Sequence, residues 1–380
     1  MRDSNQTPPH EPPLLPPIAS DFSFPVPPEG GEGVAPAPAS MPGLPLPRAL
    51  VVWLVLLLGF GVGGVALGQQ ELAMLAAFAG IFVAANAADA DRGWRELYYA
   101  IGWVVPALGF AASMAVAAAI WKSPLPGFTR AGLVVVSSVA AGISVLCIPP
   151  FAGRALAKFL FHDPDPYRLH LTARCVVITL ALALPGWFAA QQMLETLLHE
   201  NVSLMDQAGL SGSLLGYALL AFAGVGTWVR RSFAGACERL GLRVPGLRDL
   251  LVTGIALGAL WLLNTGADFV QQHWFPDLWA SDRRMTEAIA SGVTPARAVL
   301  LGLSAGIGEE ITLRGALQPR LGIPLTAAFF AALHVQYSWF GMLVIFLLGV
   351  LLGQVRKRTN TTVAILAHVA YDVIAVLGGK

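Results

Sequence analysis

The chain has 380 residues and a formal net charge of +1 at pH 7. Apolar residues make up 56% of it, whereas Asp, Glu, Lys and Arg together make up 12%, about half the share in a soluble globular domain. This composition excludes an ordinary soluble domain, and the near-zero net charge gives no indication of a nucleic-acid partner. The three cysteines show no Cys-x-x-Cys spacing, so we expect them to be small apolar residues within helices.

Residues 1–47 form a proline-rich stretch that contains 14 of the 27 prolines in the chain. Proline lacks the backbone N–H that a helix needs, and a high density of it favours extended, solvated backbone. The stretch also lacks the basic start and directly following apolar run of a cleavable signal peptide. We therefore expect residues 1–47 to be a disordered tail.

From Arg48 onward, apolar stretches alternate with short polar loops. A bilayer core of about 30 Å requires about 20 mostly apolar residues in a helix. Eleven stretches are predicted to be membrane helices: 49–68, 72–88, 97–121, 132–153, 174–194, 209–229, 249–270, 296–318, 322–337, 339–355 and 361–377. The predicted fold is thus all-α, a polytopic transmembrane bundle of about eleven helices.

Lys and Arg gather in three loops, at 154–174, 230–248 and 356–358, whereas residues 195–208 carry none. Loops with an excess of Lys and Arg stay in the cytoplasm. A count of eleven helices puts the three basic loops on one side, with the N-terminus in the cytoplasm and the C-terminus outside. We expect an integral protein of a bacterial-type inner membrane.

The eighth predicted helix carries two adjacent carboxylates, Glu309 and Glu310, inside an apolar run. A carboxylate near the membrane centre costs about 2.5–3.5 kcal/mol even on the gentler insertion scales, so it should be paired, protonated or facing a wet cavity. Arg314 follows Glu310 by four residues, a spacing that predicts an ion pair on one helix face. Glu309 is turned about 100° away from Glu310, which leaves it free for chemistry.

Two later helices add imidazoles to apolar segments. His334 follows Phe330 by four residues, and Asp372 follows His368 by four, which places the latter two on one helix face. With a rise of 1.5 Å per residue from the predicted cytoplasmic helix ends, Glu309, His334, His368 and Asp372 lie about 10–18 Å deep. Because independent structural residues have no reason to share a depth, we expect them to line a single polar cavity.

Three motifs in this order, Glu-Glu-x-x-x-Arg, Phe-x-x-x-His and His-x-x-x-Asp on separate late helices, resemble the signatures of the CPBP intramembrane proteases. These are relatives of the type II CAAX prenyl endopeptidases and are also called the abortive-infection family. The resemblance covers residues 245–377 and leaves the transmembrane helices of residues 48–230 without a role. The third motif ends in Asp372, where the prenyl proteases usually carry Asn and bacterial relatives carry either residue.

The resemblance implies an intramembrane endopeptidase that hydrolyses peptide bonds. By this resemblance, Glu309 and His334 activate a water molecule, which suits a carboxylate acting as general base. His368 and Asp372 face the oxyanion. An ionised Asp372 would repel the developing negative charge, so we expect it to be protonated or to orient His368. Arg314 would hold Glu310, and Phe330 belongs to the supporting residues.

Alternatives to a metal-free peptidase remain open at this stage. Glu309, His334 and His368 could bind zinc with a fourth position for water, although no His-Glu-x-x-His helix is present. A non-catalytic member of the fold would use the polar layer as a scaffold or binding cavity. A proton-coupled transporter would relay protons through it, but the first half of the chain lacks a matching set of ionisable groups. The expected partners are the lipid bilayer and a peptide or protein substrate that reaches the cavity from the membrane or the cytoplasm.

Overall fold

The computed structural model describes residues 43–123, 125–161, 164–199, 207–290 and 293–378. These residues form helices, with no β-strand among them, which confirms the predicted all-α class. Of the predicted disordered tail, residues 1–42 lie outside the described residues. The first helix already begins at Leu46, inside the stretch assigned to the tail.

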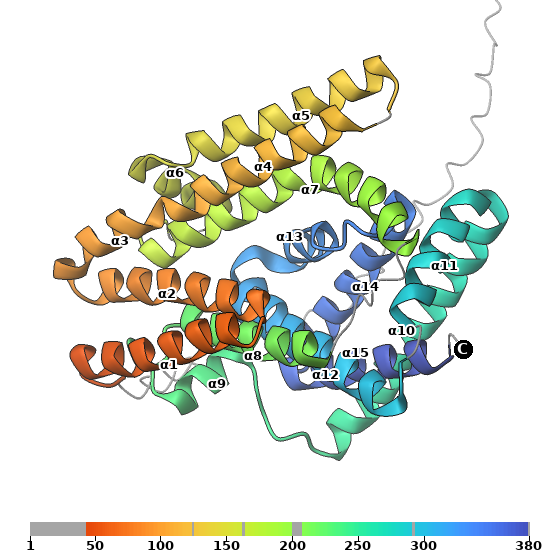
Figure 1. The fold of residues 1–380 in the computed structure, drawn as a ribbon. Coiled ribbons are helices and arrows are strands. Elements are labelled where there is room, and N and C mark those ends of the chain that lie inside the picture. Colours follow the sequence, from red (N-terminus) through yellow and green to blue (C-terminus); the bar gives the residue numbers. More distant parts are fainter. Residues whose placement is uncertain (1–42, 124, 162–163, 200–206, 291–292, 379–380) are drawn as a thin grey trace, which may run out of the picture. The chain divides into compact units, whose positions relative to one another are not determined.

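The helices follow one another with few long connections (Figure 1). The first ten elements are α1 (Leu46–Ala66), α2 (Gln70–Ala90), η1 (Arg92–Trp94), α3 (Arg95–Gly102), α4 (Val104–Lys122), α5 (Gly127–Leu146), α6 (Pro150–Leu160), α7 (Tyr167–His199), α8 (Gln207–Gly224) and α9 (Phe233–Leu240). The remaining seven are α10 (Leu247–Trp274), α11 (Pro276–Ala290), α12 (Pro295–Glu310), the π-helix η2 (Ile311–Leu317), α13 (Gln318–Ala332), α14 (Trp339–Arg358) and α15 (Thr361–Gly378).

Within the described ranges, eight helices are long and apolar enough to cross a membrane, or nine if the bent pair Pro276–Ala290 and Pro295–Ala332 counts as one span. Large apolar side chains project outward from these helices, for example Val55 and Val62, each more than 60% exposed. Such surfaces are stable against lipid and not against water. The chain is therefore a polytopic integral membrane protein, as the sequence predicts.

The predicted count of eleven membrane helices is not reproduced, and two segments show why. The stretch 132–153 divides into α5 and α6, because Pro150 begins a new helix at a position where its missing N–H costs no hydrogen bond. The stretch 209–229 corresponds to α8, whose apolar part, Gly209–Gly224, is too short to qualify as a span by length. Hydropathy alone does not separate these cases from full spans.

The helices pack in two groups, which α2 and α8 connect. Helices α4, α5 and α7 lie side by side, and α6 packs on α7 (Figure 1). Helices α10, α12, α13, α14 and α15 form the other group, in which α12 packs on α15 and α13 on α14. Helix α8 contacts both α2 and α12. The helices of the predicted N-terminal block, residues 48–230, thus contribute one wall to the C-terminal group.

Candidate active site

Two glycines let α12 approach α15 closely enough to join the first and third motifs. A Cβ atom on Gly306 would lie 2.8 Å from the backbone N of Val369, and one on Gly302 would lie 2.9 Å from its carbonyl O. Backbone atoms cannot turn away from such a clash as a flexible side chain can, so small residues are required where membrane helices meet at this separation. The contact places Glu310 beside His368.

A π-helical stretch, Ile311–Leu317, follows directly after Glu310. This corrects the prediction of one continuous α-helix over 296–318. Arginines from two other helices bind carbonyls of the stretch: Arg239 donates to Gly315 O at 3.0 Å, and Arg356 Nε donates to Arg314 O at 3.0 Å. Short π-helical segments are rare and occur frequently at functional sites, because they re-aim side chains within a helix.

Glu310 is the centre of a buried chain of charged groups. Its side chain and that of Arg314 are both 0% exposed, and Glu310 Oε2 lies 3.4 Å from Arg314 Nε. The ion pair that the four-residue spacing predicts is therefore confirmed. Glu310 Oε1 also lies 3.1 Å from His368 Nδ1, and His368 Nε2 lies 3.5 Å from Asp372 Oδ2. The contact between Glu310 and His368 joins two helices and was not predicted.

Phe330 connects the three motifs through its ring. The Arg314 guanidinium carbon lies 5.0 Å from the ring centroid, within range of a cation–π interaction. The same ring lies 4.7 Å from the His334 ring and 6.2 Å from the His368 ring, both edge to face. In the part of the chain that the structure describes, Arg314 Nη1 and Nη2 have no hydrogen-bond partner, so the aromatic face is their principal contact.

His334 is half-buried and is held by its own helical turn. Its Nδ1 lies 2.9 Å from the carbonyl O of Phe330. A carbonyl can only accept, so this contact requires the proton on Nδ1, and in a neutral ring Nε2 is then the acceptor. The Phe-x-x-x-His spacing thus positions His334, because Phe330 supplies both a ring contact and a backbone acceptor to it.

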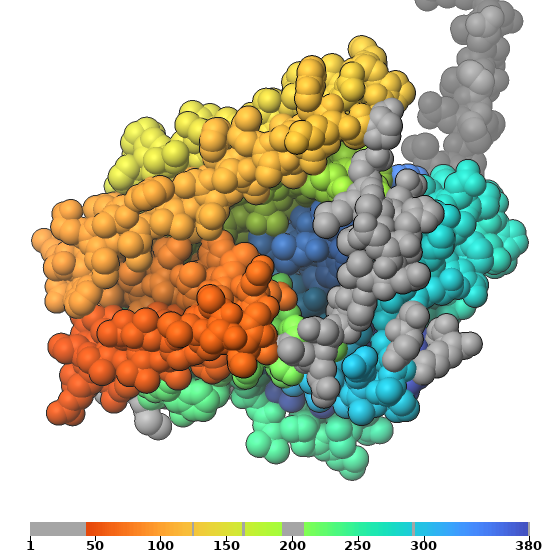
Figure 2. All heavy atoms as spheres, in the orientation of Figure 1, coloured from red at the N-terminus to blue at the C-terminus, as the bar shows by residue number. Residues whose placement is uncertain are grey.

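Glu309, His334, His368 and Asp372 all line one cavity of about 1040 Å³. Glu309 is half-buried, whereas the adjacent Glu310 has no exposed surface and is absent from the wall of this cavity. The space-filling view shows a hollow beside α2 and α7, with blue atoms of the C-terminal helices on its floor (Figure 2). The structure therefore brings the four predicted catalytic residues to one cavity. Glu310 and Arg314 stay out of its wall, and Glu310 contacts the cavity-lining residue His368 from behind.

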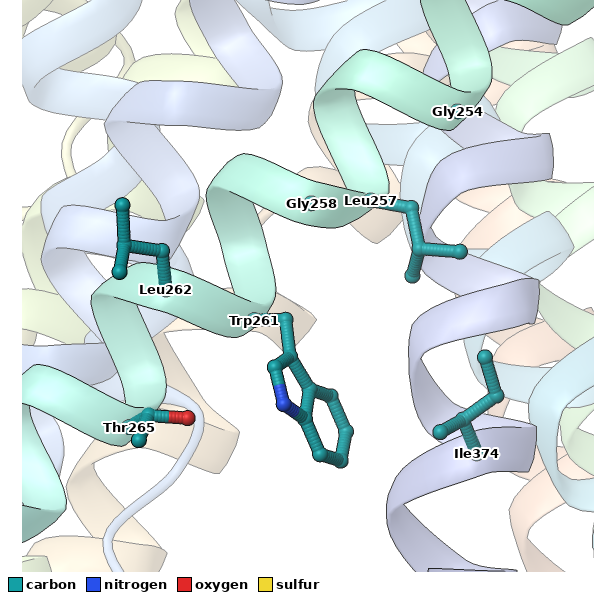
Figure 3. A pocket seen from close by; sticks show the side chains of 7 residues that line it. All are labelled: Gly254, Leu257, Gly258, Trp261, Leu262, Thr265 and Ile374. Carbon is teal, nitrogen blue, oxygen red and sulfur yellow. The ribbon is translucent and has the colours of Figure 1, made fainter.

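A second hollow, of about 470 Å³, lies outside this polar layer. Its walls are Gly254, Leu257, Gly258, Trp261, Leu262 and Thr265 of α10 together with Ile374 of α15 (Figure 3). None of these residues is ionisable, and Leu262 is 75% exposed. The hollow therefore has the character of a lipid-facing groove and offers no group for acid–base chemistry.

The three residues that the zinc alternative names, Glu309, His334 and His368, all line the cavity. Glu310 and Asp372 engage both ring nitrogens of His368, and a zinc ligand needs one of them free. Among the described residues, no three His, Cys, Asp or Glu side chains come together as a metal ion requires.

Sequence reasoning missed the residue that anchors the far end of the cavity, Asp282 of α11. Its carboxylate accepts hydrogen bonds from Ser338 N and Ser338 Oγ, both at 2.6 Å, and from Gln271 Nε2 at 2.7 Å. Ser338 also caps α14 by accepting from Gly341 N. The Ser338 cap is a readable helix-start signal, but nothing in the sequence indicates that Asp282, 56 residues earlier, binds it.

The comparisons with known proteins concern this same part of the chain. Residues 292–374 match the family model of the type II CAAX prenyl endopeptidases, Rce1-like. The matched segment contains all three motifs, so the resemblance read from them is confirmed. The match supports an intramembrane protease of the CAAX type as the kind of function.

One curated relative matches over a longer stretch. The protein named "Uncharacterized protein YpbD", from Bacillus subtilis (strain 168), is 28% identical over 138 residues, which cover 35% of this chain and 71% of that protein. The comparison with solved structures found no match.

Proposed function

We propose that this protein is an intramembrane endopeptidase that hydrolyses peptide bonds inside the cavity of the C-terminal helices. The observation that carries the proposal is that Glu309 of α12, His334 just after α13, and His368 and Asp372 of α15 line one cavity within the stretch that matches the Rce1-like family model. An ionisable group in a membrane segment is costly, so four of them around one cavity require a common purpose.

Glu309 is the general base of the proposed reaction, and His334 is its partner. Glu309 reaches the cavity without the cation that neutralises Glu310. His334, with Nδ1 directed at the Phe330 carbonyl, offers Nε2 as an acceptor to the same water molecule. Removal of a proton from that water produces the nucleophile that attacks the peptide carbonyl carbon, and the protonated Glu309 then returns the proton to the leaving amine.

The oxyanion of the tetrahedral intermediate is stabilised by His368 in this proposal. Its ring lies between Glu310 and Asp372, and only an imidazolium donates from both nitrogens. A cation held in place before the reaction stabilises developing negative charge without reorganising in the transition state. Glu310, itself held by Arg314, is a positioning residue for this ring. No step requires a metal ion, so chelators should leave the cleavage rate unchanged.

The test is cleavage of internally quenched fluorogenic peptides by the purified, detergent-solubilised protein. Glu309→Gln should lower the rate by about 10² to 10⁴, the usual contribution of a positioned general base. The matched control is Glu238→Gln, which changes an exposed carboxylate on α9 outside the cavity. Full activity of Glu309→Gln, with the control also active, would exclude Glu309 as the base. Cleavage that a chelator abolishes and zinc restores would replace this mechanism with the metal-dependent one.

A further inference from the structure

In α2, α8, α10 and α15, the residues that line the catalytic cavity reach toward one end of the bundle and stop short of the other. Helix α2 contributes Glu71 from its first turn, and α8 contributes residues 210–217, which end well before its C-terminus. Helices α10 and α15 run the opposite way and contribute residues 260–271 and 368–378, from about the middle of each helix toward its C-terminal end. From the layer of Glu309 the cavity therefore extends toward one end of the bundle only.

Helix α11 belongs to that end and completes the cavity wall. Trp279 Nε1 donates to Asp268 of α10 at 2.8 Å, and Asp282 binds the start of α14 through Ser338. Ser213 of α8 donates to Glu71 of α2 at 2.5 Å on the same side. These contacts form the rim of the cavity, which we define by Glu71, Asp268, Asp282, Arg283 and Glu287. The rim carries four carboxylates and one guanidinium, and Arg283 pairs with Glu287 at 2.8 Å.

The opposite end of the bundle is basic. Arg239 of α9 donates to the π-helix, and Arg356 reaches the same segment from the end of α14. Burial, followed by the neighbouring guanidiniums of Arg320, Arg231 and Arg356, lowers the pKa of Arg239 to about 10. Asp89, at the end of α2, pairs with Arg168 and Arg230 at this end too.

An excess of Lys and Arg keeps a membrane-protein face in the cytoplasm. The end that carries Arg230, Arg231, Arg239, Arg320, Arg356 and Arg358 is therefore cytoplasmic, and the rim faces the other way. We propose that the cavity opens to the non-cytoplasmic side and that its substrate is a peptide segment presented there. This rests on the proposed function, because it names the side from which the same site receives its peptide.

The proposal differs from the expectation that a peptide reaches the cavity from the membrane or the cytoplasm. Counted from the predicted helix ends, Glu309 lies about 13 Å from the cytoplasmic end of its helix, so a path from the cytoplasm to Glu309 would be short. That count ignores what fills the intervening space. Between Glu309 and the basic end lie the buried Glu310 and Arg314, the π-helix and its two arginine contacts. This layer closes the cavity toward the basic end.

Cysteine accessibility tests the direction of opening without depending on catalysis. Three single substitutions are compared in right-side-out and inside-out membrane vesicles: Ala305→Cys in the cavity wall, Glu287→Cys at the rim, and Lys357→Cys at the basic end. The probe is a small, charged, membrane-impermeant methanethiosulfonate, and labelling of the native protein is subtracted. Ala305→Cys and Glu287→Cys should react in right-side-out vesicles, and Lys357→Cys in inside-out vesicles. Reaction of Ala305→Cys from the inside-out side alone would overturn the proposal.

A cleavage experiment tests through activity from which side the substrate enters. Membrane-impermeant fluorogenic peptides are added outside sealed vesicles of each orientation that contain the native protein. Cleavage in right-side-out vesicles, with little in inside-out vesicles until detergent is added, supports the proposal, and the reverse pattern overturns it. If no peptide is cleaved even in detergent, the proposed function fails, whereas the labelling of Ala305→Cys still decides the direction of opening.

Discussion

Two groups of buried charges in this molecule look alike in composition and differ in how completely they are satisfied. At the end of α2, Asp89 accepts from Tyr167 N at 2.6 Å and from Arg168 Nη1 at 2.5 Å, and Arg230 lies 3.7 Å away. In the cavity layer, Glu310 contacts Arg314 at 3.4 Å and His368 at 3.1 Å. The Asp89 group ties three chain segments together with short hydrogen bonds. Among the described residues, Nη1 of Arg230 is without a hydrogen-bond acceptor in that group, whereas Nε, Nη1 and Nη2 of Arg314 are all without one in the Glu310 group.

The difference indicates separate purposes. The Asp89 group lies at helix ends. The side chains of Arg168 and Arg230 are 13% and 30% exposed, so water still solvates these charges in part and their desolvation penalty is lower. Glu310 and Arg314 have no exposed surface. A fully buried pair seldom adds net stability compared with apolar residues of the same volume. The Asp89 group therefore holds chain segments together. The Glu310 group lies beside the cavity and orients the His368 ring.

Removing the arginine from each group should separate them most clearly. Arg314→Met leaves Glu310 as an uncompensated buried charge, and we expect a loss of about 3–5 kcal/mol in the free energy of unfolding. Arg168→Met leaves Asp89 with Arg230 and the Tyr167 N–H, and should cost about 1.5–3 kcal/mol. Denaturant unfolding of both variants in the same detergent measures the difference. Equal losses would show that the two groups are equivalent.

Breaking the contact between α12 and α15 should have the next largest effect. Gly306→Ala places a methyl group 2.8 Å from the Val369 backbone N, and overpacking of this kind costs about 1–3 kcal/mol. The matched control is Gly254→Ala, because a Cβ there has no neighbour within 4 Å. We expect Gly306→Ala to lower both the melting temperature and the cleavage rate, because it moves His368 away from Glu310. A cleavage rate equal to that of Gly254→Ala would argue against this positioning.

The ring of Phe330 should contribute a smaller, specific amount. Phe330→Leu removes the cation–π contact to Arg314, worth about 0.5–2 kcal/mol, and the ring that packs against His334. Phe329→Leu makes the same chemical change one residue earlier, in the cluster that packs against α7. Melting temperatures and cleavage rates of the pair should show the larger loss for Phe330→Leu. Identical losses would mean that only ring volume matters.

The smallest change is expected for Asp372, the last residue in the series of contacts that runs from Arg314 through Glu310 and His368. Asp372 is 17% exposed and lies 3.5 Å from His368, the longest of the three contacts. In Asp372→Asn the amide oxygen can still accept from the ring, so unfolding should be unaffected. The cleavage rate should fall by about tenfold at most, the low end for one hydrogen bond to a charged group. A fall as large as that of Glu309→Gln would assign Asp372 a part in proton transfer.

Local contacts in the site could be predicted because they repeat every helical turn. Glu310 with Arg314, Phe330 with His334 and His368 with Asp372 are each four residues apart, about one helical turn, so each pair is close in the chain as well as in space. The membrane character follows equally from composition, because an apolar run must find an apolar environment. These features depend on near neighbours in the chain, so the sequence by itself determined them.

The tertiary structure decided everything that joins one helix to another. His368 binds Glu310 across 58 residues, and Arg239 and Arg356 hold the π-helix from two other elements. Such contacts depend on which helix faces meet and how closely, which hydropathy and spacing do not encode. The same reason explains why the direction in which the cavity continues was visible only once the helices were assembled.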